Sequence, residues 1–369
     1  MAAGVVYAGD STGPDVTVFE IADSSGFGEG LEEYSQSGDT ISYAMMTQSC
    51  NRGNEPLDWY DSNDDHPVIA QNMYRLKDGR FEHIGLSWLK HGFAALNETD
   101  CGPCQSTGFD TLGVDCADTY SAGLNSSGLG PRSDINASTG ESTVNPSFPA
   151  DNTHDGRVVV YVDDIDPDVN GNGDAEYFVE GHYIAEDDTA AGNDDNNASW
   201  RPVNVISPSN VSSTGITHEG EPAMYAWQAN DSGVSINTVD VPDDGRYHLG
   251  VKVTDNGDGT WHYEYAVQNL NSHRSGQSFS VPVPAGANVT NIGFHAPEYH
   301  SGEIYSNDDW SATVADGAVT WETESFDENE NASALRWSTL YNFRFDADVP
   351  PTSGQVSLGL FRPGSPDSI

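Results

Sequence analysis

The stretch LGVKVTDNGDGTWHYEYAVQNL, from Leu249 to Leu270, predicts a long β-hairpin. Its centre, residues 255–259, reads DNGDG, and Asn-Gly and Asp-Gly pairs favour the tight turns that join antiparallel strands. In the second arm, apolar and polar residues alternate, with apolar side chains at Trp261, Tyr263, Tyr265 and Val267. An alternation of period two is typical of a strand with one buried face. This stretch therefore indicates an antiparallel sheet that covers a core.

Similar patterns recur along the chain and predict a mostly β protein. Residues 72–76 and 80–84 flank the turn at residues 77–79 and form a second expected hairpin. Further strands are expected at residues 158–162, 177–184, 289–294, 340–345 and 355–360, and one short helix at residues 86–96. Because 38 glycines and 19 prolines interrupt the sequence, long helices have little room. We predict an antiparallel, jelly-roll-like β-sandwich with long disulfide-stapled loops and at most one or two short helices.

The density of strand patterns changes near residue 150. Residues 97–152 are rich in Gly, Ser, Asn and Cys and show little periodicity, whereas strand patterns dominate from residue 158 onward. We expect a hairpin-rich and loop-rich region with the cysteines at residues 1–150, and a β-sandwich at residues 151–369. One continuous domain is almost as compatible with the pattern.

The charge balance is extreme. The chain has 58 Asp and Glu against 14 Lys and Arg, which gives a formal net charge of -44. At molar salt the Debye length falls to about 3 Å, which screens repulsion between neighbouring carboxylates. Aromatic residues make up 10% of the chain, and this is more core material than disordered acidic chains contain. We predict a folded, halophilic protein with an acidic surface and no nucleic-acid partner, because phosphate binding needs a basic face.

The four cysteines lie within 67 residues of one another, at Cys50, Cys101, Cys104 and Cys116. An even, clustered count predicts two disulfides, for which three pairings are possible. The tetrapeptide Cys101-Gly-Pro-Cys104 matches a thioredoxin-type redox motif, but neither a βαβ unit nor a following helix is evident in the sequence. We therefore favour structural disulfides, which are typical of exported proteins.

The location of the protein follows from the same features. Residues 1–9 lack the charged start and long apolar stretch of a signal peptide, so we expect either a cytoplasmic protein or one that begins after a cleavage point. The cysteines favour the second. No apolar run approaches the ~20 residues that a membrane-spanning helix needs. We expect an extracellular or cell-surface protein without a membrane span.

An acidic turn at residues 166–176 predicts a calcium site. Oxygen-bearing side chains occupy alternate positions there, which lets a tight loop wrap a hard cation. The pattern departs from an EF-hand, because Tyr177 stands where the bidentate Glu belongs, and a hydrated loop without metal is equally compatible. The candidate calcium ligands are Asp166, Asp168, Asn170, Asn172 and Asp174.

A histidine-rich segment predicts a second type of metal site. Residues 293–303 hold two imidazoles and two carboxylates at an expected strand end, and Zn²⁺, Cu and Fe accept such ligands. The candidate ligands are His295, His300 and Glu303. Alternatively, each histidine only hydrogen-bonds a turn.

Three stretches carry no acidic residue: residues 83–97, 266–297 and 331–345. At the average density of 58 acids in 369 residues, the second stretch would hold about five. These windows are either core strands that need no hydrating carboxylates or a binding site where salt adaptation was not tolerated. The candidate substrate-orienting residues in or beside them are His91, His262, Arg274, Arg336 and Arg344.

Seven stretches together resemble an uncharacterised group of secreted bacterial proteins. They are HPVI at 66–69, GRFE at 79–82, WLKHGF at 88–93, LGPRS at 129–133, WHYEY at 261–265, HSGE at 300–303 and LYNFRFD at 340–346. The similarity extends from about Pro14 to Gly364. It implies export and folding as a single unit, and it implies no particular activity.

These features lead to three hypotheses of function. The first is an exported β-sandwich that binds Ca²⁺ or another divalent metal and recognises an extracellular glycan or small molecule through exposed aromatic side chains. The alternative is a metal-dependent extracellular enzyme with Zn²⁺ or Cu at a His-ligated site. The third is a structural surface protein. No nucleotide cofactor is expected.

Overall fold

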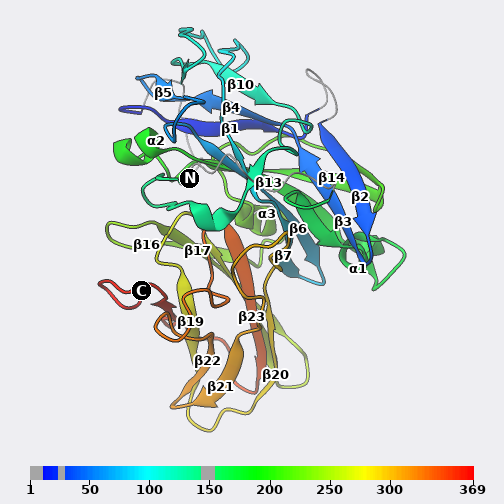
Figure 1. Cartoon of the computed structure of the whole chain (residues 1–369). Helices are drawn as coiled ribbons and strands as arrows, with labels where there is room; N and C mark the ends of the chain where they lie inside the picture. The colour runs from blue at the N-terminus through cyan, green and yellow to red at the C-terminus, as the bar shows by residue number, and fades with distance from the viewer. Residues whose placement is uncertain (1–10, 24–29, 143–153) are drawn as a thin grey trace. The chain divides into compact units, whose positions relative to one another are not determined.

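The computed structural model in Figure 1 describes residues 11–23, 30–142 and 154–369. Contacts divide the chain into two compact units. Unit 1 comprises Met1–Arg75 and Ile84–Ala223, and unit 2 comprises Leu76–His83 and Met224–Ile369. Within the described ranges, no helix has the length and apolar character needed to cross a membrane.

The largest sheet of unit 1 has ten strands. Its main path runs in the order β15-β14-β13-β6-β7-β12-β3-β2, and β8 and β11 continue from β6. The strands are β2 (Leu31–Ser37), β3 (Thr40–Met45), β6 (Val68–Lys77), β7 (Arg80–Leu86), β8 (Leu89–His91), β11 (Leu129–Gly130), β12 (Val158–Tyr161), β13 (Glu176–Ile184), β14 (Ala198–Ser207) and β15 (Asn210–Ser213).

Two smaller sheets and short helices complete unit 1. The sheets are β1 (Val16–Ile21), β4 (Thr47–Asn51) and β10 (Ala117–Tyr120) in the order β1-β4-β10, and the pair β5 (Leu57–Asp58) and β9 (Thr111–Leu112). The helices are α1 (Val162–Ile165), α2 (Glu186–Ala191) and the 3-10 turns η1 (Arg132–Asp134) and η2 (Asn172–Asp174). Val18 of β1 shares a core with Tyr43, Met73 and Val179 of the large sheet, so the two sheets pack as layers of a sandwich.

Unit 2 is a sandwich of a five-stranded and a four-stranded antiparallel sheet. The first has the order β16-β17-β18-β23-β20 and contains β16 (Ser235–Asp240), β17 (Arg246–Asp255), β18 (Trp261–Asn269), β23 (Thr339–Ala347) and β20 (Val289–His295). The second has the order β21-β22-β19-β24 and contains β21 (Ser311–Ala315), β22 (Ala318–Glu322), β19 (Gly276–Pro282) and β24 (Ser357–Leu360). One helix, α3 (Met224–Asn230), begins the main segment of this unit.

The alternation along β18 builds the core of unit 2. Tyr263 and Tyr265 lie opposite Phe345 and Phe343 of β23, and all four side chains are buried. The Tyr263 and Phe345 rings are stacked with centroids 4.9 Å apart. Phe279 of the four-stranded sheet reaches Phe343 with ring centroids 4.7 Å apart, which joins the two layers. The predicted mostly β, antiparallel sandwich is therefore confirmed.

The expected hairpins and strands form, but the expected short helix does not. Residues 249–270 fold as β17 and β18, and residues 72–84 fold as β6 and β7 around the turn that contains Asp78, whose φ is 53°. The prediction of a helix at residues 86–96 is wrong, because Leu89–His91 forms β8 and pairs with both β6 and β11. The sheet also continues past residue 150, since β12 pairs with β3 and β7. The expected boundary itself falls in residues 143–153, outside the described residues.

The cysteines form the two predicted disulfides. Cys50 of β4 is bonded to Cys101, and Cys104 is bonded to Cys116. Because Cys101 and Cys104 belong to different bridges, they do not form the redox pair that a thioredoxin-type motif requires. Both bridges staple the loop region between β8 and β10.

Candidate functional site

The predicted transition-metal ligands lie at the end of β20 and in the loop that follows it. His295 ends β20, and its Nε2 lies 3.0 Å from the backbone oxygen of His83. His300 and Glu303 lie in the following loop, where the Glu303 backbone N donates to the His300 oxygen at 3.3 Å. Over residues 11–23, 30–142 and 154–369, no three His, Cys, Asp or Glu side chains are arranged to hold a metal ion. Transition-metal binding at these residues stays a prediction from the sequence.

The predicted calcium loop is organised by its own hydrogen bonds. Asn172 is buried: its Nδ2 donates to the backbone oxygen of Asp166 at 3.1 Å, and its Oδ1 accepts from Arg75 Nη1 at 3.2 Å. The Asp166 carboxylate accepts from the backbone N of Asp168 at 3.0 Å. Calcium binding here stays a prediction from the sequence. The other candidate ligands are exposed: Asn170 and Asp174.

Two of the substrate-orienting candidates have mainly structural partners. His91 Nδ1 lies 2.9 Å from His66 Nε2, so one imidazole donates to the other, and burial lowers the pKa of His91 to about 4. Arg274 donates from Nε to the backbone oxygen of Arg362 at 3.1 Å and from Nη1 to that of Pro366 at 2.6 Å. Arg274 therefore holds the C-terminal segment in place.

His262 and Arg344 come together in one charged cluster of unit 2. His262 Nδ1 lies 2.6 Å from Asp346 Oδ1, and His262 Nε2 lies 3.2 Å from Glu264 Oε2. Arg80 Nε donates to the same Glu264 oxygen at 3.0 Å, and Arg344 stands opposite Glu264 in the β18–β23 register. Period-two alternation places these charges on the face of the sheet away from the aromatic core. Hydrogen bonds to Glu264 and Asp346 raise the pKa of His262.

The raised pKa of His262 predicts a pH-dependent stability. A histidine with a raised pKa in the folded state contributes stability that is full below its unfolded pKa of about 6.5 and is lost as pH rises through the folded pKa. We expect His262→Gln to lower the free energy of unfolding by about 0.5–1 kcal/mol below pH 6.5 and by less at higher pH, because the site is partly solvated. Chemical denaturation at constant molar salt measures this gap, and His218→Gln in unit 1 is a control outside the cluster. If the difference in free energy of unfolding between the natural protein and His262→Gln grows with pH, the pKa of His262 is not raised in the folded state.

The exposed aromatic side chains that the sequence suggested for glycan recognition are found in unit 1. Among the described residues, the large exposed aromatics are Phe93 and Phe109, which are 43% and 68% exposed. Their segments are joined by a hydrogen bond from Ala95 N to the Phe109 backbone oxygen at 2.9 Å, and Lys90 Nζ lies 5.3 Å from the Phe93 ring centroid. These aromatics line no part of the pocket described next.

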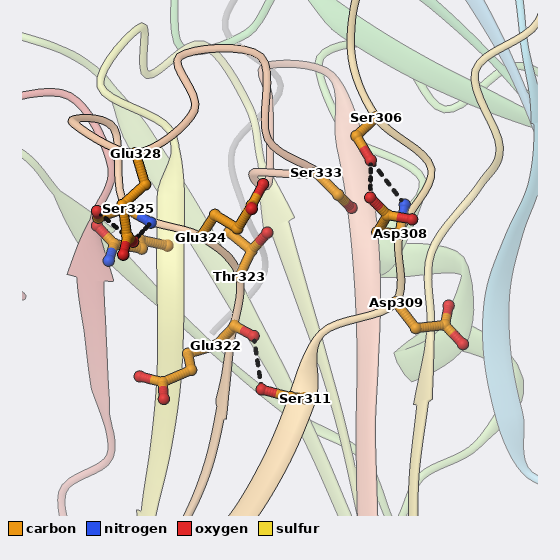
Figure 2. A pocket seen from close by; sticks show the side chains of 11 residues that line it. Ser306, Asp308, Asp309, Ser311, Glu322, Thr323, Glu324, Ser325, Glu328 and Ser333 are labelled. Carbon is orange, nitrogen blue, oxygen red and sulfur yellow. Dashed lines mark hydrogen bonds between the residues drawn. The ribbon is translucent and has the colours of Figure 1, made fainter.

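A pocket of about 360 Å³ opens in unit 2 and is drawn in Figure 2. The β21–β22 hairpin contributes Ser311 and Glu322, and β19 contributes Gln277. The remaining walls come from the loop before β21 and the long loop that follows β22. The complete lining is Gln277, Ser306, Asp308, Asp309, Ser311, Glu322, Thr323, Glu324, Ser325, Glu328 and Ser333.

The lining combines five carboxylates with hydroxyl and amide side chains. Several of these groups bond one another, as Figure 2 shows: Ser306 Oγ donates to Asp308 Oδ2 at 2.6 Å, and Ser325 Oγ donates to Glu328 Oε2 at 2.6 Å. The second bond lowers the pKa of Glu328. The carboxylates of Asp309 and Glu322 accept no hydrogen bond from any described residue. The pocket therefore presents two uncommitted carboxylates among fixed hydroxyl groups.

The sequence alone did not indicate this pocket. Its acids, at residues 308–309 and 322–328, read as part of the general acidic surface. A usable signal existed in the interleaving of hydroxyl residues with acids in ETES, at residues 322–325. The remaining information is tertiary, because Gln277, Ser311 and Ser333 are brought together only by the pairing of β19 with β22 and of β21 with β22, and by the loop that follows β22.

A scan against models of known protein families found none that matches the chain, and a search of curated proteins found no match either. The resemblance to secreted bacterial proteins stays a prediction from the sequence.

Proposed function

We propose that this chain is an exported, salt-adapted β-sandwich protein that binds a polyhydroxylated ligand, an extracellular glycan, in the acidic pocket of unit 2. The observation that carries the proposal is the composition of the pocket lining. Five carboxylates accept hydrogen bonds, and Gln277 and the hydroxyl groups that do not already donate to Asp308 and Glu328 supply donors as well as acceptors.

Sugar hydroxyl groups match this lining because each of them both donates and accepts. A hydrogen bond from a hydroxyl to an ionised carboxylate is charge-assisted and stronger than a bond between neutral groups. Asp309 and Glu322 are the natural acceptors, since their carboxylates are uncommitted and lie on different wall segments. The volume of about 360 Å³ falls in the range of ligand pockets, roughly 300–1,000 Å³.

The pocket fits a neutral polyol better than a cation. A cation offers no acceptor to the hydroxyl and amide donors of the lining. In brine, molar K⁺ or Na⁺ also competes for the carboxylates, and screening over about 3 Å weakens electrostatic attraction. Hydrogen bonds to a neutral ligand are much less affected by ionic strength.

A glycan array probed with fluorescently labelled protein in molar KCl tests this function. We expect Asp309→Asn and Glu322→Gln each to weaken binding of the best glycan at least about tenfold, because each removes a charge-assisted bond worth roughly 1.5–3 kcal/mol. Asp243→Asn is the matched control: it removes one charge from an exposed turn of unit 2, and Asn tolerates the φ of 56° at that position. Binding that is unchanged in both pocket variants contradicts the proposal. Binding of amines in place of glycans, with a steep gain on dilution of salt, identifies a cation site instead.

A further inference from the structure

Arg336 is a buried cation in unit 2. Only 2% of the residue is exposed, although arginine is among the residue types that are rarely buried without a partner. Its guanidinium lies against two aromatic rings, with Cζ 4.0 Å from the Tyr305 centroid and 4.6 Å from the Phe361 centroid. These contacts stabilise the cation through the ring faces but leave its N–H groups in the guanidinium plane to find their own acceptors.

The hydrogen bonds of Arg336 satisfy one of its three nitrogens. Nη2 donates to the backbone oxygens of Glu330 at 3.0 Å and Ala332 at 2.9 Å. Nε and Nη1 are buried and have no hydrogen-bond partner among the described residues. A buried unsatisfied donor on a charged group costs more free energy than one on a neutral group, and such groups are rare in folded proteins. These donors therefore find no acceptor within residues 11–23, 30–142 and 154–369.

The electrostatic surroundings of Arg336 are positive or neutral. Burial and the neighbouring Arg362 lower its pKa, and the other groups that act on its charge are tyrosine hydroxyls. Arg362 Nε donates to the backbone oxygen of His273 at 3.1 Å. Burial, and then Arg362 and Arg336, lower the pKa of His273 to about 4, so its imidazole is neutral near pH 7. Asp244, beside His273, is already committed: its carboxylate accepts from the backbone N of His273 at 3.2 Å and from Ser272. Two guanidinium groups thus act on each other here, in a chain that has only 14 Lys and Arg.

We propose that the buried guanidinium of Arg336 binds a small inorganic anion of the size of chloride, with the neighbouring Arg362 contributing to the positive potential. In the planar guanidinium, the Nε–H group points to the edge that it shares with Nη2, and Nη1 points to other edges. A single ion therefore bonds only one of the two unpartnered donors. An anion supplies both the missing acceptor and the missing counter-charge. A water molecule supplies only the acceptor, and it also needs acceptors for its own hydrogens.

The site also bears on the pocket. The carbonyl groups that Arg336 holds belong to residues 330 and 332, and the next residue, Ser333, lines the pocket. An anion on Arg336 therefore stabilises the segment that forms one wall of the proposed glycan site. The anion site does not depend on the glycan proposal, because it rests only on the contacts of Arg336.

Bromide in place of chloride tests the anion site directly. Crystals of the full chain grown or soaked in KBr are expected to show an anomalous bromide peak within hydrogen-bonding reach of Nε or Nη1 of Arg336. The peak is expected to disappear in Arg336→Lys, which keeps the positive charge but lacks the extra donors, and to persist in Arg246→Lys, whose guanidinium pairs with Asp240 at 2.6 Å. If Arg336→Lys does not fold, the peak in the natural protein alone decides.

Two outcomes overturn the proposal. The first is density without anomalous signal at Nε and Nη1, which identifies water. The second is bromide found only at solvent-accessible arginines such as the partly exposed Arg246, which identifies an adventitious ion only.

Discussion

In dilute buffer the protein is expected to lose its fold, and return to molar KCl is expected to restore it. The net charge of -44 produces repulsion that the folded state concentrates in a smaller volume than the unfolded chain does. Local clusters show the effect. Burial raises the pKa of Asp187 to about 6, and the negative charge of Asp58 adds to this rise. The pKa of Glu186 is also raised, first by burial and then by repulsion from Asp65, Glu141 and other carboxylates. Folding therefore brings like charges together, which disfavours the compact state unless salt screens them.

The expected loss of free energy of unfolding in dilute buffer equals the whole stability of the folded protein. The Debye length is about 10 Å at 0.1 M salt and about 3 Å at 1 M, so repulsion between carboxylates several residues apart is removed over this range. Because folded proteins are stable by only about 5–15 kcal/mol, repulsion summed over the surface can exceed that margin. Tryptophan fluorescence during thermal unfolding measures the change: the midpoint should rise steadily with KCl. A midpoint that is the same at low and high salt contradicts salt adaptation. Potassium gluconate at equal ionic strength is the control that separates screening from binding of chloride at Arg336.

The second large effect concerns the disulfides. Replacing Cys50 and Cys101 by Ser opens a loop with a sequence separation of 51, and replacing Cys104 and Cys116 opens one with a separation of 12. The chain-entropy model predicts that the free energy of unfolding falls by about 4 kcal/mol when the longer loop is opened and by about 3 kcal/mol when the shorter one is opened. Removal of the first bridge also exposes the sheet to disruption, because Cys50 lies on β4 between β1 and β10.

Equilibrium unfolding in denaturant at constant molar salt compares the two double variants. The Cys50→Ser/Cys101→Ser variant is expected to be the less stable one. Mass mapping of the natural protein without reduction is the control for the pairing. An equal or reversed order of stability, or peptides that link Cys101 to Cys104, contradicts the structure.

The fold could be predicted where local chemistry decides it. The Asp-Gly and Asn-Gly turns and the alternation at Tyr263 and Tyr265 depend only on neighbouring residues, and both hairpins form as expected. Residues 86–96 show the limit of this reasoning. Their spacing of apolar residues suits a helix, but β6 and β11 pair with Leu89–His91 on either side, and this distant pairing overrides the local preference.

The candidate site could be predicted only in part. The windows without acids led to Arg336, which lies near Arg362 in unit 2; Arg362 in turn donates to the backbone oxygen of His273, a residue that the sequence did not single out. Much of the same windows also forms the core strands β19, β20 and β23, so the structural interpretation holds for other residues in them. The pocket was missed because acids that bind a ligand and acids that hydrate a surface have the same composition. Only the fold shows which of them surround a cavity.

A crystal structure with the best glycan from the array decides whether the acidic pocket of unit 2 binds a glycan. Crystals kept in molar salt and soaked with that glycan should show it in the pocket, with its hydroxyl groups donating to the Asp309 and Glu322 carboxylates, and should show an empty pocket for Glu322→Gln at the same concentration. Glycan bound instead at Phe93 and Phe109 in unit 1, with no density in the pocket, contradicts glycan binding by Asp309 and Glu322.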